Sequence, residues 1–147
     1  LPVPFIHIST FGGAEPGCRV GQAVLALAAD PAFLAAVNHR AALFHRGLAT
    51  LQTRHSAFFK GVRQLGLMMG LELADGLGGP LLTRAAYDQG LLMIYAANDP
   101  AVCQCLPPLI ISPEEVQETL VRLDRALEAA ARLHGELGAA AGRGGVP

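Results

Sequence analysis

The chain has 147 residues, of which 52% are hydrophobic and 16% charged, and its formal net charge is −1. This composition can bury one sizeable core and excludes a largely disordered chain. The balanced charge, with no basic stripe carrying interleaved aromatics, argues against a nucleic-acid partner, and no apolar run reaches the roughly 18 residues that a membrane span needs.

The first residues, LPVPFIHI, predict an edge segment that enters a loop, because two prolines interrupt them. They lack the length and the basic flank of a signal peptide, so we interpret Leu1 as a cut inside a longer chain or a processed end. Three cysteines, an odd count, argue against a disulfide framework and favour a reducing compartment, so a cytoplasmic location is expected.

Two helices are predicted next. The turn FGGAEPG is followed by the run CRVGQAVLALAA, which predicts a helix over residues 18–29. Asp30 is a good N-cap and Pro31 suits the first helical position, so a long helix is expected over residues 30–54. Its apolar residues recur at spacings of four and three, which places them on one face. This stripe consists of Val37, Ala41, Phe44, Leu48 and Leu51.

In the middle of the chain the spacing of apolar residues no longer fits a helix. From Val62 the run LGLMMGLEL predicts one glycine-interrupted strand, bulged at Gly66 or Gly70. The segment LGGPLLTRAAYDQG predicts a short helix, which Pro80 begins and Gly90 ends. Two more strands are predicted over LLMIYAA and VCQCLPPLII, with a turn at NDPA between them.

The last predicted element has an explicit helix start. Ser112 is the cap, Pro113 the first helical residue, and Glu115 completes a capping box. The glycine-rich residues 135–147 carry no apolar stripe and predict a disordered tail. Helices with a small, mostly antiparallel sheet give a two-layer α+β unit. The buried stripe of this helix is Val116, Leu120, Leu123 and Leu127.

Several residues could carry chemistry, and each also has a structural interpretation. Cys103 and Cys105 would face one side of a strand; core cysteines are preferred to a metal or redox pair, because no CxxC accompanies them. Lys60, the only lysine, could be a buried nucleophile, but a strand entry with its ammonium in water is favoured. The histidines are interpreted as surface or cap residues, and the sequence predicts neither a metal site nor a catalytic set.

The loop HISTFGGAEPGC and one arginine remain as binding candidates. Ser9 and Thr10 supply two hydroxyls, and the glycines let backbone N–H groups approach a ligand, which makes a usable phosphate cradle. The loop matches neither common nucleotide-binding glycine motif, so a plain turn is the simpler interpretation. Arg63, at the mouth of a strand, could present a bidentate fork to a carboxylate or form a surface ion pair.

Four segments together resemble the C-terminal portion of class III pyridoxal-phosphate aminotransferases, a family that includes ornithine, acetylornithine, 4-aminobutyrate and diamine enzymes. They are STFGG, GVRQLGLMMGLEL, QGLLMIYAANDP and LPPLIISPEEVQETLVRLDRAL, in the family's order over about residues 4–133. The chain departs from the usual STFGGNP at Ala14 and Glu15, and from the usual VRGxGLMxGIEL at Gln64, which replaces a glycine.

The resemblance implies roles for three residues. Thr10 matches the family threonine that hydrogen-bonds the phosphate of pyridoxal 5'-phosphate in the neighbouring subunit, and Ser9 beside it is a weaker candidate. Arg63 matches an arginine that binds a substrate carboxylate in several members. The family fold, α/β as a whole, assigns residues 1–29 to the end of the large domain, 30–54 to the long connecting helix, 55–134 to the small C-terminal domain and 135–147 to the tail.

The resemblance also implies what this chain lacks. The Schiff-base lysine, the aspartate that pairs with the pyridine nitrogen and the ring-stacking residues all precede STFGG in the family, so Lys60 is not that lysine. The complete enzyme is expected to be a homodimer that moves an amino group from an amino acid or ω-amine to a 2-oxo acid, without nucleic acid or membrane. This segment alone would not transaminate.

Two other functions stay open from the residues themselves. One is a non-catalytic small α+β module that binds a ligand or dimerises through its apolar face. The other is a regulatory amino-acid-binding domain, whose pocket would not depend on Thr10.

Overall fold

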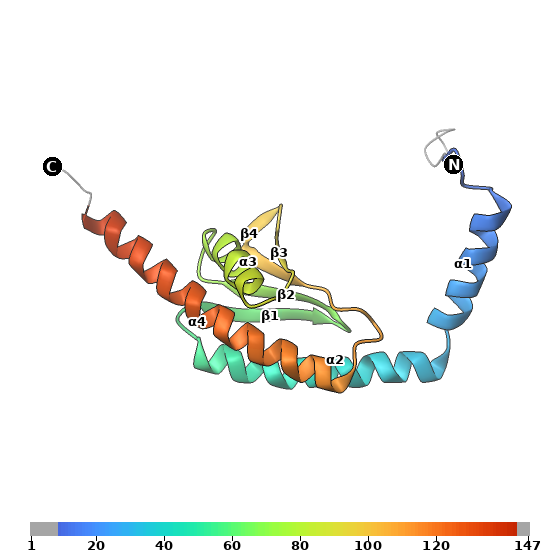
Figure 1. The fold of residues 1–147 in the computed structure, drawn as a ribbon, viewed down its shortest axis with the longest axis horizontal. Coiled ribbons are helices and arrows are strands. Elements are labelled where there is room, and N and C mark those ends of the chain that lie inside the picture. The colour runs from blue at the N-terminus through green and yellow to red at the C-terminus, as the bar shows by residue number, and fades with distance from the viewer. Residues whose placement is uncertain (1–8, 144–147) are drawn as a thin grey trace. The chain divides into compact units, whose positions relative to one another are not determined.

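The computed structural model describes residues 9–143, and of residues 141–143 it describes the backbone alone. The edge segment predicted for residues 1–8 lies outside this range. The chain divides into two compact units, Leu1–Ala36 and Val37–Pro147. The element order is shown in Figure 1.

The first unit holds a turn and the helix α1. Backbone N–H groups of Gly12 and Ala14 donate to the carbonyls of Ser9 and Phe11, which closes the turn. Helix α1 spans Glu15–Ala28 and so begins three residues before the predicted start, because Pro16 fits the first turn of a helix. None of its residues is buried. Its exposed large apolar residues are Val20, Val24, Leu25 and Leu27.

Helix α2, Pro31–Arg54, starts as predicted. Asp30 Oδ1 accepts hydrogen bonds from the backbone N–H groups of Ala32 and Phe33, at 2.7 and 3.0 Å. Among residues 9–143 no single helix is long and apolar enough to cross a membrane, although α1 and α2 taken as a bent pair meet that criterion of length and composition.

The predicted apolar stripe of α2 forms part of the core. Ala41, Phe44, Leu48 and Leu51 are buried, and Val37 is partly buried against the same cluster. Glycine is unfavourable inside a helix, but Gly47 has a packing role. A Cβ built there would lie 2.8 Å from Leu120 Cδ2, so the missing side chain lets α2 approach α4 closely.

The sheet has four antiparallel strands in the order β1-β2-β4-β3: β1 Phe59–Leu65, β2 Met68–Leu73, β3 Ile94–Ala96 and β4 Asp99–Cys105. The single strand predicted from Val62 is therefore wrong: the chain reverses at Gly66, whose φ of 58° suits a tight turn. The one irregularity of the β1–β2 register lies between Phe59 and Gly61, away from the predicted bulges at Gly66 and Gly70.

Helix α3, Gly78–Asp88, and helix α4, Pro113–Arg143, complete the second unit. Gly90, with a φ of 75°, follows the end of α3 as predicted. The capping box of α4 is confirmed: Ser112 Oγ accepts from the Glu115 N–H at 3.1 Å, and Glu115 Oε2 accepts from the Ser112 N–H at 2.8 Å. Because α4 continues to Arg143, the disordered tail predicted from residue 135 is wrong for residues 135–143. Alanine-rich sequence extends a helix that is already nucleated.

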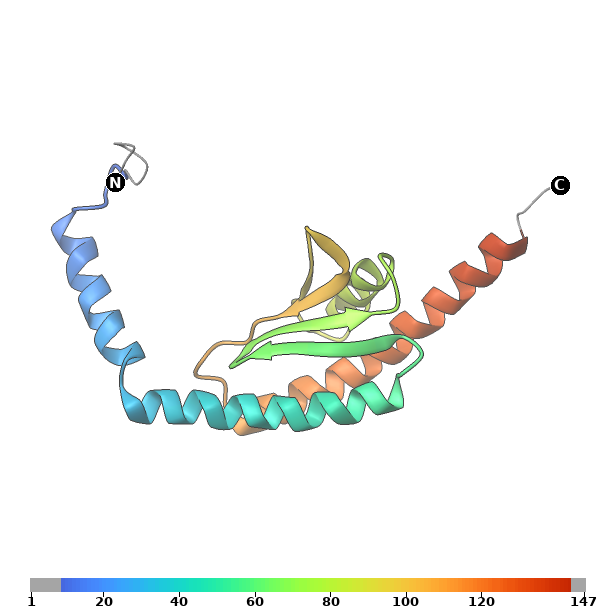
Figure 2. The same ribbon diagram turned by 180° about the vertical axis from the view of Figure 1, so that it is seen from behind.

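The three helices of this unit cover one face of the sheet, which confirms the two-layer α+β architecture (Figure 2). Along β2, Met69, Leu71 and Leu73 are buried, whereas the alternate residues point to the opposite face. We call this opposite face the outer face. In the described part of the chain no helix covers it, and it exposes Leu65, Met68 and Ile94.

The two strand cysteines lie in the core, as preferred from the sequence. Cys103 and Cys105 are buried free thiols, whereas Cys18 on α1 is an exposed free thiol. Burial raises the pKa of the Cys103 thiol to about 11 and that of the Cys105 thiol to about 12, because the thiolate loses its hydration.

We expect an alkylating reagent at pH 8 to modify only Cys18 in the native chain and all three cysteines after denaturation. The buried thiols react slowly, because they are both inaccessible and protonated at that pH. Mass spectrometry of the intact chain counts the modified thiols. Rapid native modification of Cys103 would contradict the packing described for β4.

A second prediction concerns Gly79, at the buried start of α3. A Cβ at this position would clash with the carbonyl oxygen of Pro100 and lie 2.7 Å from Tyr95 Cβ. Gly79→Ala should lower the free energy of unfolding by about 2 kcal/mol, since backbone atoms cannot move aside cheaply. Urea unfolding measures the change. Gly76→Ala is the matched control, because its nearest contact would be at 4.0 Å, and it should have little effect.

Candidate functional site

The hydroxyls of Ser9 and Thr10 lie in the turn that precedes α1. Both residues are exposed, and neither hydroxyl has a partner among residues 9–143. The N-cap residue of α1, Ala14, provides no side-chain hydrogen bond to the first N–H groups of the helix. Hydroxyl donors beside a helix N-terminus are groups that can bind an oxyanion such as a phosphate, and the phosphate cradle stays a prediction. Glu15, an acidic residue in the first turn, opposes this attraction.

Arg63 lies on β1 and projects from the outer face. Its Nε donates to Glu72 Oε1 at 2.9 Å, and its Nη2 lies 3.9 Å from Asp99 Oδ2. The side chain of Arg63 is 63% exposed. The structure thus contains the surface ion pair that the sequence left open. It also shows that a carboxylate reaches this guanidinium through one short contact, which leaves further N–H donors open to solvent.

The strand register places Arg63 in a row that crosses the whole outer face. Arg63 is opposite Gly70, Gly70 is opposite Gln104, and Gln104 is opposite Ile94. Gly70 has no side chain, and the space above it is partly filled by Val102 of β4, whose Cγ1 would lie 3.2 Å from a Cβ at Gly70. Sequence reasoning missed Gln104 and the two acidic neighbours of Arg63, because these relations depend on the pairing of strands. The alternation along β4 is the only sequence signal that sets Gln104 apart from the buried cysteines.

Gln64, the residue that departs from the family's glycine, lies beside Arg63 and points to the helix side of the sheet. Its Nε2 donates to the carbonyls of Ala41 on α2 and Gly66 in the hairpin turn, both at 2.9 Å. Its Oε1 lies 3.3 Å from His45 Nδ1, also on α2. The carboxamide therefore joins the hairpin to the helix.

Lys60 has the structural position favoured from the sequence. It is exposed near the start of β1, and its Nζ donates to the carbonyl of Ser56 at 3.0 Å. An exposed ammonium lacks the desolvation that would make it a good nucleophile.

Two other histidines form contacts between residues that are distant in the sequence. His55 pairs with Asp124 at 2.6 Å, and His134 pairs with Asp75 at 2.8 Å. The hydrogen bond from His134 lowers the pKa of Asp75. No group of three potential metal ligands occurs among residues 9–143.

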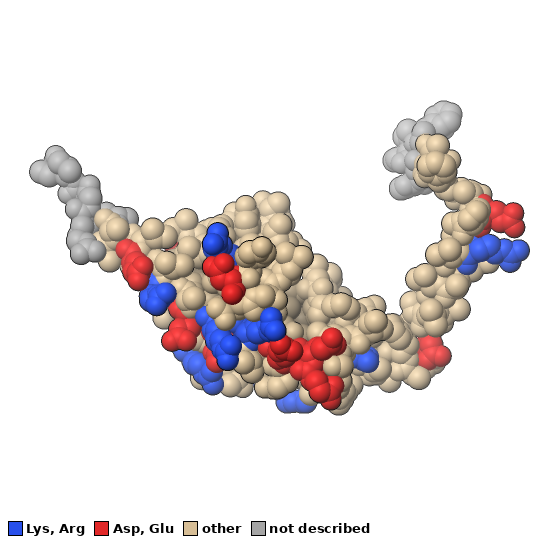
Figure 3. Space-filling model, viewed as in Figure 1, with Lys and Arg blue, Asp and Glu red and all other residues tan. Residues whose placement is uncertain are grey.

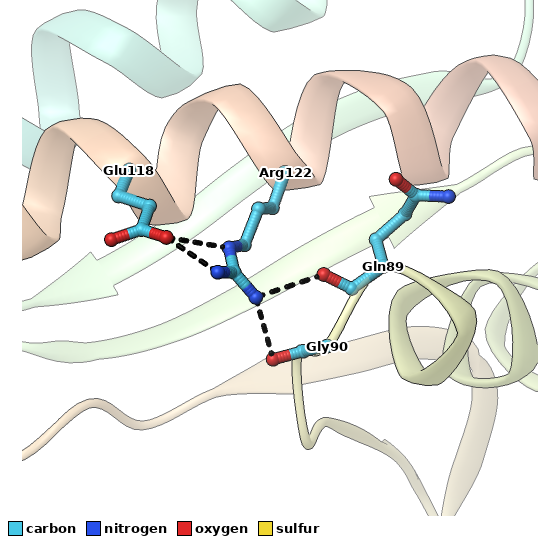
Figure 4. Close-up of polar contacts among 4 residues, drawn as sticks. All are labelled: Gln89, Gly90, Glu118 and Arg122. Carbon is cyan, nitrogen blue, oxygen red and sulfur yellow. Dashed lines mark hydrogen bonds and ion pairs between the residues drawn. The ribbon is translucent and has the colours of Figure 1, made fainter.

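Arg122, a second cationic side chain near a surface groove, is occupied by structural contacts (Figure 4). It pairs with Glu118 one turn earlier on α4, and its Nη1 donates to the carbonyls of Gln89 and Gly90 at 3.2 and 3.4 Å. These are carbonyls at the end of α3, where a cation stabilises the helix. Figure 3 shows acidic and basic side chains interspersed over this side of α4.

Two surface grooves of about 450 and 410 Å³ flank α4. The first lies between α2 and α4, and the second contains Arg122. Neither is lined by Thr10 or Arg63. The predicted phosphate ligand and the predicted carboxylate ligand belong to the first and the second unit respectively.

Comparison with known proteins identifies the family. The profile described as Aminotransferase class-III matches residues 2–127. An uncharacterized aminotransferase of Archaeoglobus fulgidus is 40% identical over 129 residues, which cover 88% of this chain and 30% of that protein. The acetylornithine aminotransferase of Rhodobacter capsulatus is 38% identical over 120 residues, covering 82% of this chain and 30% of its own length.

Solved structures agree with this relationship. The N-acetylornithine aminotransferase of Stenotrophomonas maltophilia superposes with a TM-score of 0.66 at 32% identity, covering 75% of this chain and 30% of its own. The ornithine aminotransferase of Toxoplasma gondii, at 24% identity and a TM-score of 0.73, shares the fold over 88% of this chain and 31% of its own. The chain spans about 30% of the length of these relatives, and it belongs to the class III aminotransferases.

Proposed function

We propose that this chain supplies the C-terminal portion of a pyridoxal-phosphate-dependent aminotransferase. The complete enzyme would transfer an amino group from an amino acid or ω-amine to a 2-oxo acid. The observation that carries the proposal is the profile match over residues 2–127, together with relatives named acetylornithine aminotransferase. The structure of the Toxoplasma gondii relative has pyridoxal phosphate partly occupying its active site.

The turn before α1 would hold the phosphate of the cofactor. Thr10 would donate its hydroxyl to a phosphate oxygen, with Ser9 as a secondary donor, and the first N–H groups of α1 would add to the attraction. In a homodimer, Thr10 would reach the cofactor of the neighbouring subunit. When bound, the cofactor supplies the electron sink that amino transfer requires.

Arg63 would orient the substrate by binding its carboxylate. The guanidinium offers a planar set of donors, and the contact with Glu72 shows that a carboxylate can approach it. Lys60 is exposed and its ammonium donates to the carbonyl of Ser56, and we do not propose it as the amine that binds the cofactor. We therefore assign that lysine to a part of the enzyme outside this chain. The free thiols of all three cysteines support a cytoplasmic enzyme.

The alternative, a free-standing non-catalytic module, is less well supported. Helix α1 has no buried residue and exposes several large apolar side chains. A helix with this pattern is stabilised by packing against other protein. A chain that packs against the remainder of an aminotransferase would provide such a surface.

We expect Thr10→Ala to weaken the affinity of the complete gene product for pyridoxal phosphate by about 10- to 100-fold, since one hydrogen bond to a charged oxygen is lost. Thr10→Ser keeps a hydroxyl and should retain most of the affinity, and Ser9→Ala should have a smaller effect. Titration of the apoprotein, followed by cofactor absorbance, gives each dissociation constant. Wild-type affinity of Thr10→Ala would show that this threonine does not bind the phosphate.

We expect Arg63→Ala to raise KM for the 2-oxo acid by about 10- to 100-fold with a smaller change in kcat, because the carboxylate is bound in both the ground state and the transition state. The KM of Arg63→Lys should lie between those of the wild type and Arg63→Ala, since lysine keeps the positive charge but lacks the planar set of donors. Arg84→Ala is the matched control: Arg84 is an exposed, ion-paired arginine on α3. Steady-state kinetics of the complete gene product measure KM for the 2-oxo acid. An unchanged KM in Arg63→Ala would show that Arg63 does not bind the substrate carboxylate.

A further inference from the structure

We propose that the groove between α2 and α4 is a binding site for a carboxylate that carries an unbranched apolar chain. Arg46 binds the carboxylate, and the aliphatic side chains between the two helices hold the apolar chain. The groove is lined by neither Thr10 nor Arg63, so the proposal does not depend on the roles proposed for those two residues.

The groove has the size and the apolar surface that such a ligand needs. Its volume of about 450 Å³ lies within the range of small-molecule sites. Residues of α2 between positions 43 and 54 and residues of α4 between positions 113 and 124 line it. At a rise of 1.5 Å per residue, each of these stretches is about 16 Å long, so an extended alkyl chain of medium length fits along it. The aliphatic lining residues are Leu43, Leu51, Val116, Leu120 and Val121.

The charged residues of the lining favour an anion. Helix α2 carries three arginines and no acidic residue. Two of these arginines, Arg46 and Arg54, line the groove, and the only acidic lining residue is Asp124 of α4. The lining therefore has one net positive charge, which attracts a carboxylate and repels a cation.

The two arginines lie a little over two helical turns apart on α2, but only one of them has a carboxylate partner. Arg54 forms an ion pair with Asp124 across the groove. The residue two turns before Asp124 on α4 is Gln117, which also lines the groove and carries no charge. In the part of the chain that the structure describes, Arg46 has no ion-pair partner. A ligand carboxylate would supply to Arg46 the partner that Arg54 has, and the Gln117 amide offers a further N–H donor.

The second groove, on the other side of α4, shows the opposite arrangement. Its charged lining residues are Glu115, Glu118 and Arg122, which give one net negative charge. Its arginine is already occupied by Glu118 and by the carbonyls of Gln89 and Gly90 (Figure 4). Of the two grooves, only the one between α2 and α4 therefore combines an aliphatic lining with an arginine that is open to an anion.

The test titrates the complete gene product with decanoate and follows the heat of binding by calorimetry. We expect saturable binding whose dissociation constant rises about 5- to 10-fold in Arg46→Ala, because a charge-assisted hydrogen bond is lost. Arg46→Lys should bind with intermediate affinity, since it keeps the charge without the planar donors. Arg132→Ala is the matched control and should bind decanoate like the wild type, because Arg132 is exposed on α4, two turns beyond Asp124, and does not line the groove.

Two further measurements examine each half of the ligand. Gln117→Glu places a carboxylate on α4 at the position that lacks one, and it should weaken decanoate binding at least as much as Arg46→Ala, because the new side chain competes for Arg46 and repels the ligand. Hexanoate, with four methylene groups fewer, should bind the wild type at least about 10-fold more weakly than decanoate, since less apolar surface leaves water. Decylammonium, which has an alkyl chain of the same length and a positive charge, should not compete with decanoate.

The outcomes separate this site from the proposed function. Because Arg46 is exposed and has no ion pair among residues 9–143, Arg46→Ala should unfold in urea like the wild type and keep its KM for the 2-oxo acid, whatever the result for Thr10→Ala. Absence of saturable decanoate binding would refute the site. Equal affinity of the wild type and Arg46→Ala would show that decanoate binds elsewhere, and equal affinity for hexanoate and decanoate would overturn the role of the aliphatic lining.

Discussion

The second unit depends on burying one face of its sheet beneath three helices. Phe44 and Leu48 of α2, Leu71 of β2, and Leu123 and Leu127 of α4 are all fully buried, and each such side chain contributes about 1.5–3 kcal/mol by leaving water. Because side chains alternate along a strand, this burial also determines the other face. The alternate side chains of the strands lie on the outer face, and the predicted substrate ligand Arg63 is among them.

Features that depend on local chemistry were predictable from the sequence. The caps Asp30 and Ser112 and the apolar stripes of the two long helices are confirmed, since each requires only residues a few positions apart. The hairpin was missed because its turn lacks polar residues: Leu67, directly after Gly66, is buried in the core. A continuous apolar run therefore concealed a reversal of the chain, and the register across the sheet was lost with it.

The candidate site likewise contains residues that the sequence identified and neighbours that only the structure shows. Ser9, Thr10 and Arg63 were singled out by their chemistry, the family resemblance supplied their roles, and those roles stay predictions. The surroundings of Arg63 come from other strands, and no local pattern connects Glu72 or Gln104 to it. The contacts of Gln64 with α2 could not be predicted either, because they join residues about twenty positions apart. The sequence shows that Gln64 replaces a glycine of the family motif, but only the structure shows that its side chain makes three contacts.

The sequence separation between α2 and α4 has a consequence for synthesis of the chain. Seventy residues separate Arg54 from Asp124, which pair across these helices. At ribosomal rates of roughly 5–20 residues per second, the apolar stripe of α2 emerges some 4 to 14 seconds before its partner on α4. During that interval the nascent polypeptide displays Phe44 and Leu48 without their final cover.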